Sequence, residues 1–324
     1  MDVKYNIIFI AHDDWCNVGT EWALACQSIG MKSLAICWQR AMWHYIHGSV
    51  QIHDNDELQR ISDGADVVVH MHTHIAPIKR VPGQKWIVFH GGSRFRRDPA
   101  THISTQNPLV DMTWIQTGEL FGFGCKNEHW MMPAIDTEYL QPHFSDPRRI
   151  SEDGLRFAHY PRVAGNGIVK KGTKGIVKIA CDVERLRENF RWSYGLEPKL
   201  WVENMERMSQ PDIYIERLSR SCKEWGITAM EAAALGKVVI TQFESKERYE
   251  REFECECPFV ISNTPEELKE KIMWLLDIPP EEIIEIQKRT RDWVCKVHGY
   301  EPTARRIQKH LEELNENNSN LAMV

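Results

Sequence analysis

Short apolar runs recur along the first half of the chain and alternate with segments of helical or loop character. Runs that are apolar throughout are typical of strands buried on both faces of a parallel sheet. We expect strands at 6–11, 33–38, 66–70, 86–90, 112–116 and 130–133. A helix is expected from Thr20, a capping residue, to Ile29, with Gly30 at its end. Repeated strand–crossover–strand units predict a doubly wound α/β domain.

The second half repeats this pattern after a polar segment at 142–154 that contains two prolines. Expected strands are 155–159, 199–202, 212–215, 238–241 and 258–261, and expected helices include 175–190, 265–276, 281–298 and 303–314. We therefore predict an N-terminal domain at 1–148 and a C-terminal domain at 149–314. The last helix is a candidate to pack back on the N-terminal domain. Residues 315–324 are expected to form a disordered tail.

Composition narrows the class of protein. The 324 residues carry a net charge of −6, spread evenly over both halves, which argues against a nucleic-acid-binding domain but leaves room for a local basic patch. The nine cysteines lack C-x-x-C spacing. No signal peptide or apolar run of membrane-spanning length is found. We expect free thiols, no transmembrane segment and a cytoplasmic location; the sequence does not predict the oligomeric state.

Segment 225–241, WGITAMEAAALGKVVIT, carries the strongest functional signal. Gly226 leads a short Ala-rich helix, and Gly236 ends it before an apolar strand. A glycine-led helix N-terminus presents N–H groups and a positive dipole end that suit the phosphates of a nucleotide. Glu231 lies about one turn further along and can accept hydrogen bonds from a ribose diol. An ordinary Ala-rich packing helix is the alternative interpretation.

Histidines and glycine-rich loops follow many of the expected strands. In open α/β sheets, ligands bind at the carboxyl ends of the strands. The residues expected at these ends are His12, Asp13, the run from His70 to His74, His90-Gly91-Gly92, Thr117-Gly118, His159 and Gly226.

Several of these segments resemble, in order, the motifs of family 4 glycosyltransferases. DVVVHMHTH (66–74) and WIVFHGGS (86–93) are similar to two of the family's strands, and MPAIDTEYLQP (132–142) is similar to its interdomain signature. RFAHYPR…KKGTKG (156–175) resembles the strand and loop that supply a phosphate-binding Arg and Lys. DIYIE (212–216) and segment 225–241 resemble the strand, donor loop and helix that follow. The resemblance implies the GT-B architecture, in which two Rossmann-like doubly wound parallel-sheet domains face a central cleft.

The resemblance also implies roles for individual residues. His90 is implied to lie beside the transferred sugar, although a core histidine bonded to the backbone fits the same position. His159 and Lys170 are local alternatives to the implied phosphate-binding arginine, and Lys171 also fits a solvated lysine run. The residues implied to bind the donor are Gly19, Arg162, Lys171, Lys223, Gly226, Ile227, Thr228 and Glu231.

One position departs from the family's pattern. The family has two glutamates eight positions apart across the donor loop, and the residue eight positions before Glu231 is Lys223. Either Lys223 faces the donor, or the loop is shifted by one residue and Glu224 joins His90 as a catalytic residue. If neither holds, the carboxylate that contacts the sugar is absent, and donor choice or catalysis is altered.

The function implied by the resemblance is transfer of a sugar from a nucleotide-diphosphate sugar, such as a UDP-sugar, to an acceptor hydroxyl. It implies a hexosyltransferase-like enzyme that retains anomeric configuration. Arg162, Lys171 and the Gly226 helix N-terminus would stabilise the departing diphosphate. The chain lacks a convincing D-x-D motif, so we expect no metal and no cofactor besides the donor.

The acceptor is not readable from the sequence. The candidate residues on the acceptor side are His12, Asp13, His72, Arg94 and Arg96. The run from Ser93 to Arg97 is basic with one aromatic residue, which is typical of a solvated loop and also fits a polyanionic acceptor. A glycan, a lipid, a small molecule and a hydroxylated base in DNA all stay open as acceptors.

Two other functions account for part of the sequence. A group formed by His12, His70, His72, His74 and His90 could bind zinc in a metal-dependent hydrolase, although the second domain would then lack a role. A nucleotide-binding module that has lost catalysis through Lys223 is the other alternative.

Overall fold

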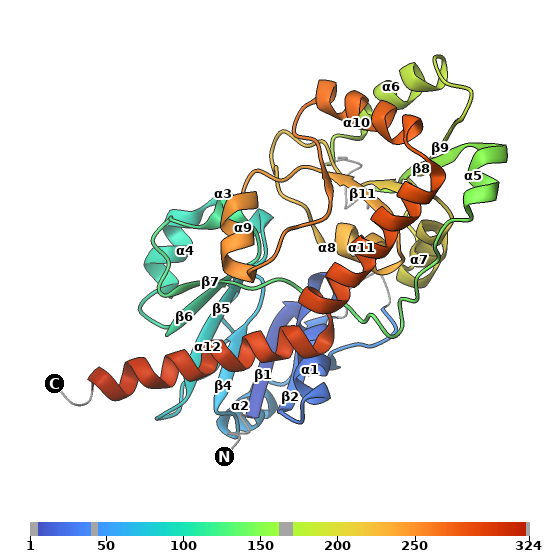
Figure 1. The fold of residues 1–324 in the computed structure, drawn as a ribbon. Helices are drawn as coiled ribbons and strands as arrows, with labels where there is room; N and C mark the ends of the chain where they lie inside the picture. Colours follow the sequence, from blue (N-terminus) through green and yellow to red (C-terminus); the bar gives the residue numbers. More distant parts are fainter. Residues whose placement is uncertain (1–5, 40–44, 162–170, 322–324) are drawn as a thin grey trace. The chain divides into compact units, whose positions relative to one another are not determined.

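A computed structural model of the protein describes residues 6–39, 45–161 and 171–321 (Figure 1). The chain forms two compact units. The first comprises Met1–Asp136 together with His298–Val324, and the second comprises Thr137–Val297. Each unit is built on its own parallel sheet, which confirms the predicted α/β class with two parallel-sheet units.

The sheet of the first unit has seven strands in the order β3-β2-β1-β4-β5-β6-β7, all parallel. Each strand except β3 and β7 coincides with an apolar run of the sequence, and β7 shares only Trp130 with the strand expected at 130–133. The short β3 was not expected, because it lies in a polar stretch. The strands are β1 (Asn6–Asp13), β2 (Lys32–Gln39), β3 (Val50–Gln51), β4 (Val67–His70), β5 (Lys85–His90), β6 (Met112–Ile115) and β7 (Glu128–Trp130).

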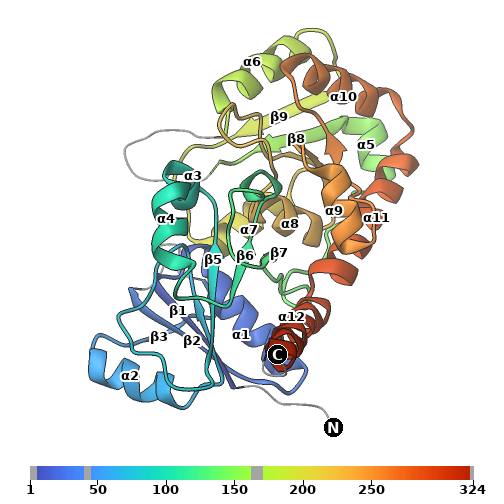
Figure 2. The same ribbon diagram turned by 90° about the vertical axis from the view of Figure 1, so that its left-hand side faces the viewer.

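Helices cover both faces of this sheet (Figure 2). On one face, α1 (Val18–Ser28) and α12 (Tyr300–Leu321) bury Trp22, Ile307 and other apolar residues against Phe9 of β1. On the other face, Leu58 of α2 (Asn55–Asp63) packs with Ile8. Two shorter helices, α3 (Ser93–Arg97) and α4 (Pro99–Gln106), follow β5, and single 3-10 turns lie at Trp15–Asn17 and Gly118–Leu120.

The sheet of the second unit has five parallel strands in the order β12-β11-β10-β8-β9. Its strands are β8 (Leu155–His159), β9 (Phe190–Tyr194), β10 (Ile213–Ile215), β11 (Val238–Thr241) and β12 (Val260–Ile261). Its helices are α5 (Pro147–Asp153), α6 (Thr173–Glu184), α7 (Trp201–Ser209), α8 (Ile227–Ala234), α9 (Lys246–Phe253), α10 (Pro265–Asp277) and α11 (Pro280–His298).

Two expected elements of the second unit are wrong. The expected helix over 175–190 ends at Glu184, and Phe190 instead begins β9 as a fully packed strand residue. The expected strand at 199–202 is the start of α7, in which Trp201, Met205 and Met208 are buried at helical spacing. In both places short apolar stretches fit a helix and a strand equally well by pattern alone.

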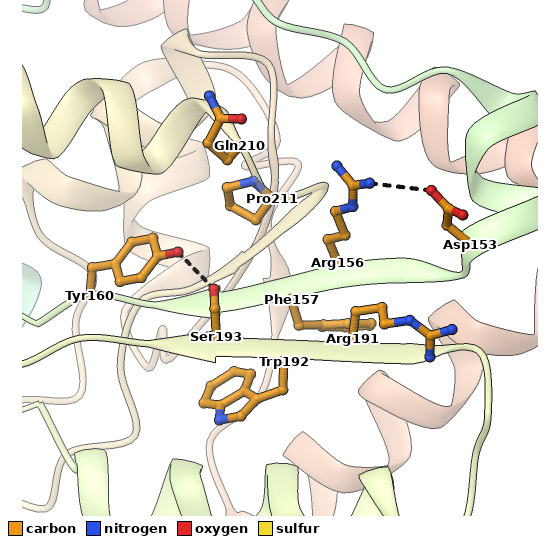
Figure 3. A pocket seen from close by; sticks show the side chains of 9 residues that line it. All are labelled: Asp153, Arg156, Phe157, Tyr160, Arg191, Trp192, Ser193, Gln210 and Pro211. Atoms are coloured by element: carbon orange, nitrogen blue, oxygen red, sulfur yellow. Dashed lines mark hydrogen bonds and ion pairs between the residues drawn. The ribbon is translucent and has the colours of Figure 1, made fainter.

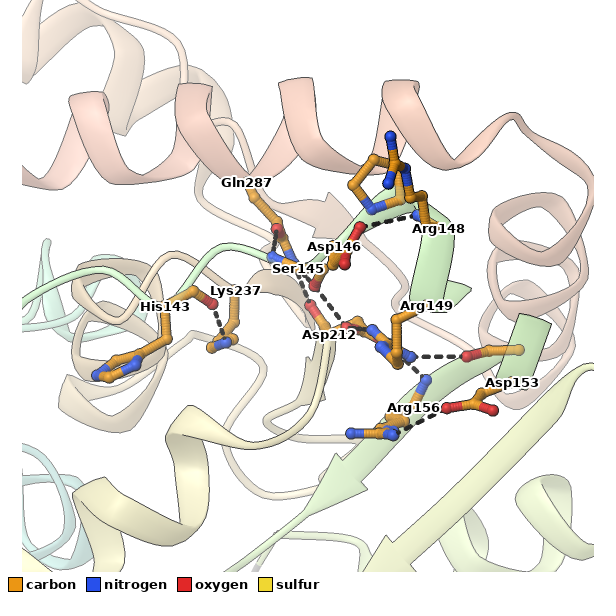
Figure 4. A network of polar contacts seen from close by, with 12 residues as sticks. His143, Ser145, Asp146, Arg148, Arg149, Asp153, Arg156, Asp212, Lys237 and Gln287 are labelled. Atoms are coloured by element: carbon orange, nitrogen blue, oxygen red, sulfur yellow. Dashed lines mark hydrogen bonds and ion pairs between the residues drawn. The ribbon is translucent and has the colours of Figure 1, made fainter. Parts of the chain in front are cut away.

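The boundary between the units differs from the expected one at 148/149, since the chain passes into the second unit after Asp136. The polar segment at 142–154 is bound into the second unit by Asp212, which is 2% exposed (Figure 4). The Asp212 carboxylate pairs with Arg149 and accepts hydrogen bonds from the Ser145 hydroxyl and, at 2.7 Å, from the Arg156 backbone N–H. A buried carboxylate needs such partners, so the polar residues of this segment satisfy a core aspartate.

The C-terminal residues also differ from expectation. Helix α12 continues through Leu321, so the predicted disordered tail is wrong over 315–321, and 322–324 lie outside the described residues. The buried side chains Ala304, Ile307, Leu311 and Leu314 of α12 belong to the core of the first unit. Across the described parts of the chain, no helix is both long and apolar enough to cross a membrane.

Candidate functional site

No described side chain caps the N-terminus of helix α8. Gly226 is its N-cap residue, lies in the extended region, and provides no side-chain hydrogen bond. The backbone N–H groups of Ile227 and Thr228 donate to no residue in the described part of the chain. Open N–H groups and the positive end of the helix dipole make this terminus suitable for an anion.

Charged side chains surround the same terminus. The Glu216 carboxylate at the end of β10 is fully buried, and one of its oxygens, Oε1, pairs with Lys171 Nζ and lies 3.3 Å from Arg217 Nη2. Its other oxygen accepts a 2.9 Å hydrogen bond from the Thr241 hydroxyl. A Cβ added to Gly226 would lie 3.1 Å from Arg217 Nη2 and 3.5 Å from Glu216 Oε1. A side chain at position 226 would therefore crowd the Arg217 guanidinium, and glycine avoids this contact.

Positive charge is concentrated at this terminus. Lys171 and Arg217 carry two positive charges, the α8 N-terminus adds a partial one, and Glu216 supplies a single negative charge. Charge-assisted hydrogen bonds from Lys, Arg and backbone N–H groups are the usual means of holding phosphate. The arrangement can bind an anion that carries more than one charge.

Glu231 lies within α8 and is 2% exposed. Its Oε1 accepts a 2.7 Å hydrogen bond from the indole N–H of Trp201 in α7. This contact fixes the carboxylate in one orientation, so its second oxygen has a defined direction. The residue is thus a buried acceptor on the same short helix as the open N–H groups.

The two candidates of the donor loop have defined partners in the second unit. Lys223 is about half exposed and pairs with Glu244 at 2.6 Å. Glu224 is 2% exposed, and its Oε1 accepts hydrogen bonds from the Ser245 hydroxyl at 2.6 Å and the Ser245 N–H at 3.0 Å. In this structure Glu224 therefore supports the start of α9, and Lys223 lies at the surface.

The phosphate-binding candidates after β8 are only partly described. Arg162 and Lys170 lie outside the described residues, whereas Lys171 contacts Glu216. His159 is buried, with Nδ1 2.7 Å from the Ile215 carbonyl oxygen and Nε2 2.8 Å from the Thr173 hydroxyl. Burial lowers the pKa of His159 to about 4, so its ring is neutral. It joins β8, the end of β10 and the start of α6, two residues after Lys171.

The corresponding helix of the first unit is capped from within. Asp14, which follows β1, is 2% exposed and accepts hydrogen bonds from the N–H groups of Gly19 at 2.8 Å and Thr20 at 2.9 Å. The Thr20 and Ser49 hydroxyls donate to the same carboxylate. The predicted role of Gly19 toward donor phosphates is not supported here, because its N–H is taken by Asp14. A Cβ on Gly19 would lie 3.2 Å from Asp14 Oδ1, which explains the glycine.

His72 lies next to this carboxylate. Its Nε2 is 3.5 Å from Asp14 Oδ1, and both His72 and Thr73 have positive φ angles, of 56° and 65°. Burial acts to raise the pKa of Asp14, but His72 and the N–H donors outweigh it and hold that pKa below its usual range. Non-glycine residues in the left-handed region are strained and are common near functional sites.

The other acceptor-side candidates are more exposed. His12 is exposed, with its ring stacked on Trp38 at a centroid distance of 6.4 Å, and Asp13 is half-buried. Arg94 is exposed, whereas Arg96 is half-buried and pairs with Glu119. In the basic run from Ser93 to Arg97, Arg96 is thus held by the carboxylate of Glu119.

His90 is a buried residue of β5, 1% exposed. Its ring stacks on Phe95 at a centroid distance of 4.0 Å, and its Nδ1 lies 3.2 Å from the Thr73 hydroxyl. Burial, with a smaller effect from His102, lowers the pKa of His90 to about 3. The neutral ring fits the core-histidine alternative.

The histidines proposed as zinc ligands do not form a ligand set. His70 is fully buried, accepts a 3.2 Å hydrogen bond from the Ala76 N–H, and has a pKa lowered to about 3 by burial. Among the described residues, no group of three or more His, Cys, Asp or Glu side chains is arranged to hold a metal ion. The metal-dependent hydrolase is therefore not favoured.

A pocket of 410 Å³ lies elsewhere on the second unit, along β8 and β9 (Figure 3). Arg156, Trp192 and Gln210 are among its lining residues, and the Tyr160 hydroxyl is 2.7 Å from Ser193 Oγ within it. None of its lining residues is a sequence-predicted site residue.

Sequence reasoning missed three residues that shape these sites: Asp14, Glu216 and Arg217. Glu216 and Arg217 directly follow the apolar run IYI, so a charged pair at the carboxyl end of a buried strand was the available signal. Asp14 follows β1 in the same manner.

Comparison with known proteins gives a fold relationship. No protein-family model matches the chain, and no curated protein gives a significant match. Among solved structures, a glycosyltransferase from Rickettsia africae ESF-5 has a TM-score of 0.58 at 12% identity, over 97% of this chain and 100% of the other. An α,α-trehalose-phosphate synthase (UDP-forming) from Burkholderia vietnamiensis has a TM-score of 0.58 at 7% identity, over 99% of each chain.

A trehalose-6-phosphate synthase studied for glycosyl transfer with retention has a TM-score of 0.56 at 10% identity, over 95% of this chain and 99% of the other. Identities this low concern the fold alone. The protein therefore has the GT-B fold of these glycosyltransferases, with one parallel α/β sheet in each unit.

Proposed function

We propose that the protein is a glycosyltransferase that moves a sugar from a nucleotide-diphosphate sugar to an acceptor hydroxyl. The observation that carries this proposal is the uncapped α8 N-terminus beside Lys171, with the buried Glu231 carboxylate about one turn further along the helix. Diphosphate and ribose in a nucleotide are separated by a similar short span. Similar folds in glycosyltransferases support this assignment.

The main chemical task is to stabilise the leaving group. Cleavage of the anomeric bond leaves a nucleoside diphosphate and a cation-like sugar. Lys171 and the N–H groups of Ile227 and Thr228 meet the charge that develops on the diphosphate, and they are fixed before the reaction begins. Glu231 holds the ribose, with its orientation set by Trp201.

Finer features of the reaction are part of the proposal. We take UDP as the first nucleotide to test and retention as the stereochemical course, because structural neighbours are described in these terms. We propose a hexose as the transferred sugar. We also propose that no metal or further cofactor is used, because Lys171 and the helix N–H groups can stabilise the charge of the diphosphate. A cytoplasmic location is proposed because none of the nine cysteines forms a disulfide.

The acceptor-side residues proposed in the first unit are His12, Asp13, His72, Arg94 and Arg96. His12 and Asp13 end β1, His72 follows β4, and the two arginines follow β5, at the edge of the sheet where ligands of such folds bind. Their mixture of imidazole, carboxylate and guanidinium groups fits a hydroxylated and anionic acceptor. A glycan, a lipid headgroup, a small molecule and a hydroxylated base in DNA share these features.

The test is a panel of nucleotide sugars and free nucleoside diphosphates screened by thermal unfolding. A ligand that binds only the native state at about 100 times its Kd adds about 2.7 kcal/mol to the free energy of unfolding and raises Tm. Stabilisation by one nucleotide class, followed by sugar transfer or slow donor hydrolysis, is expected. Binding without either reaction would identify a nucleotide-binding module, and no binding across the panel would contradict the proposal.

A further inference from the structure

Arg217 lies at the α8 N-terminus, although no motif of the resemblance assigns it a role. Its Nη2 is 3.3 Å from Glu216 Oε1 and would be 3.1 Å from a Cβ on Gly226. Lys171 Nζ contacts the same carboxylate oxygen. The buried Glu216 carboxylate therefore holds Lys171 and Arg217 near the start of α8, where the N–H group of Ile227 is open.

The placement of Lys171 and Arg217 together at a helix N-terminus is unfavourable, and a further anion would offset this cost. Positive side chains are disfavoured near the positive end of a helix, and two like charges close together repel each other. Both cations contact the single Glu216 carboxylate, so they share its one negative charge. A diphosphate held at the α8 N-terminus would bring further negative charge next to both cations.

The contacts of Arg217 orient its guanidinium. Its Nη1 donates to the carbonyl oxygen of Glu224, and Nη1 also lies 2.6 Å from Cys222 Sγ. These contacts hold one side of the planar group on the donor loop. The opposite nitrogen, Nη2, is thereby turned toward Glu216 and Gly226.

We propose that Arg217 is a second diphosphate-binding cation beside Lys171, and that Glu216 is a positioning residue that holds both cations at the α8 N-terminus. The proposal rests on the proposed function, since it concerns the nucleotide diphosphate of the donor. The rigid donor fork of an arginine is suited to two phosphate oxygens, which a lysine contacts only as a point charge.

The first experiment measures binding of UDP, uridine and inorganic pyrophosphate to Arg217→Gln by isothermal titration calorimetry, with GDP or ADP and their nucleosides used where the panel selects them. We expect UDP and pyrophosphate to bind about 10- to 100-fold more weakly, as for loss of a hydrogen bond between charged groups. Uridine should bind as in the unaltered protein. Arg185→Gln is the control, because Arg185, which directly follows α6, is 77% exposed and pairs with Asp182.

Because Arg217 also anchors the donor loop, a second variant separates contact from support. Arg217→Lys keeps the charge but loses the fork that joins Glu224 and Glu216. A diphosphate contact predicts that the lysine variant regains part of the preference for UDP over uridine. A role in loop support alone predicts that both variants weaken UDP and uridine by equal factors, and this result would overturn the assignment.

The role of Glu216 is tested by Glu216→Gln. The site becomes more positive, yet we expect weaker UDP binding because Lys171 and Arg217 lose their common anchor. Tighter or unchanged UDP binding in a variant with an unaltered Tm would overturn the positioning role. If the unaltered protein binds no nucleotide, the proposed function itself fails; if it binds UDP and Arg217→Gln does so equally well, only the present inference fails.

Discussion

The two units treat the N-terminus of a comparable helix in opposite ways. In the first unit, Asp14 caps the N-terminal turn of α1 and uses the N–H groups of Gly19 and Thr20. In the second unit, α8 begins at Gly226, and the N–H groups of Ile227 and Thr228 donate to no described residue. Both helices pack on parallel sheets, so the difference arises from a few residues at the helix start.

The comparison shows how to distinguish a structural glycine from a ligand-binding one. Gly19 and Gly226 both lack room for a Cβ, but the nearest atoms differ. Beside Gly19 lies a carboxylate that already accepts the helix N–H groups. Beside Gly226 lie the cation Arg217 and a carboxylate that holds it. The identity of the neighbouring charge, rather than the glycine itself, indicates where an external anion is required.

The largest expected effect follows from removing the internal cap. Asp14→Ala leaves four buried donor groups and His72 without the carboxylate and should lower the free energy of unfolding by about 3–5 kcal/mol, as for a broken buried pair. Urea unfolding measures the change, with Asp14→Asn as a milder control that keeps one acceptor oxygen. A loss below about 1 kcal/mol for Asp14→Ala would contradict the cap.

The same residue makes stability depend on pH. The folded-state pKa of Asp14 is depressed, so its contribution is fully present above the unfolded-state pKa, near 3.9, and is lost as pH falls through the folded-state pKa. The difference in unfolding free energy between the unaltered protein and Asp14→Asn should therefore shrink below about pH 4. A difference that stays constant down to pH 2 argues against an ionised cap.

Glu231→Gln sharpens the assignment of the second unit. The amide oxygen can still accept from Trp201, so the fold should be kept, but ribose hydroxyls lose a charged acceptor. We expect nucleoside-diphosphate binding to weaken by about 1.5–3 kcal/mol. Calorimetry with UDP measures it, and Trp201→Phe tests whether the orienting contact matters. Unchanged affinity in a folded Glu231→Gln would remove Glu231 from the site.

A matched glycine pair tests the comparison directly. Gly226→Ala places a Cβ against Arg217 and should weaken nucleotide binding by about 1–3 kcal/mol with little loss of stability, since φ at Gly226 is −122°. Gly19→Ala places a Cβ against Asp14 and should lower unfolding free energy by a similar amount. Calorimetry and urea unfolding of both variants measure the two effects. If Gly226→Ala lowered stability and Gly19→Ala weakened nucleotide binding, the roles assigned to the two glycines would be reversed.

The smallest effect is expected for Lys223→Ala. Lys223 and Glu244 are both about half exposed, so removal of this ion pair should change stability and UDP affinity by less than about 0.5 kcal/mol. Glu224→Ala should cost more stability, because Ser245 loses both of its hydrogen bonds to the carboxylate. A large loss of transfer in Lys223→Ala would place Lys223 at the donor after all.

The sequence was most informative where one physical signal dominates. Uniformly apolar runs predicted β1, β5 and β11, because a strand buried on both faces has no other simple pattern. Phe190, the first residue of β9, was placed at a helix end because it continues the apolar face of the amphipathic helix before it. Likewise, the sequence around Trp201 fits a helix or a strand, and only the packing of α7 shows that it is helical.

For the candidate site, local residues were predictable and distant pairings were not. Gly226 and its helix were visible because capping and dipole effects act between neighbouring residues. The contact between Lys171 and Glu216 joins positions 45 residues apart, and sequence pattern alone carries no signal for it. The contact between Glu224 and Ser245 spans 21 residues and was missed for the same reason.

The packing of α12 has a consequence for biosynthesis. The second unit is one continuous stretch, whereas the first needs Ala304, Ile307 and Leu311 to complete its core. The N-terminal part of the first unit is synthesised first but completes its core only after α12 has been synthesised. The second unit is able to fold before then. The usual N-to-C order of folding is reversed. A premature stop codon before residue 300 should accordingly prevent folding of the first unit rather than of the second.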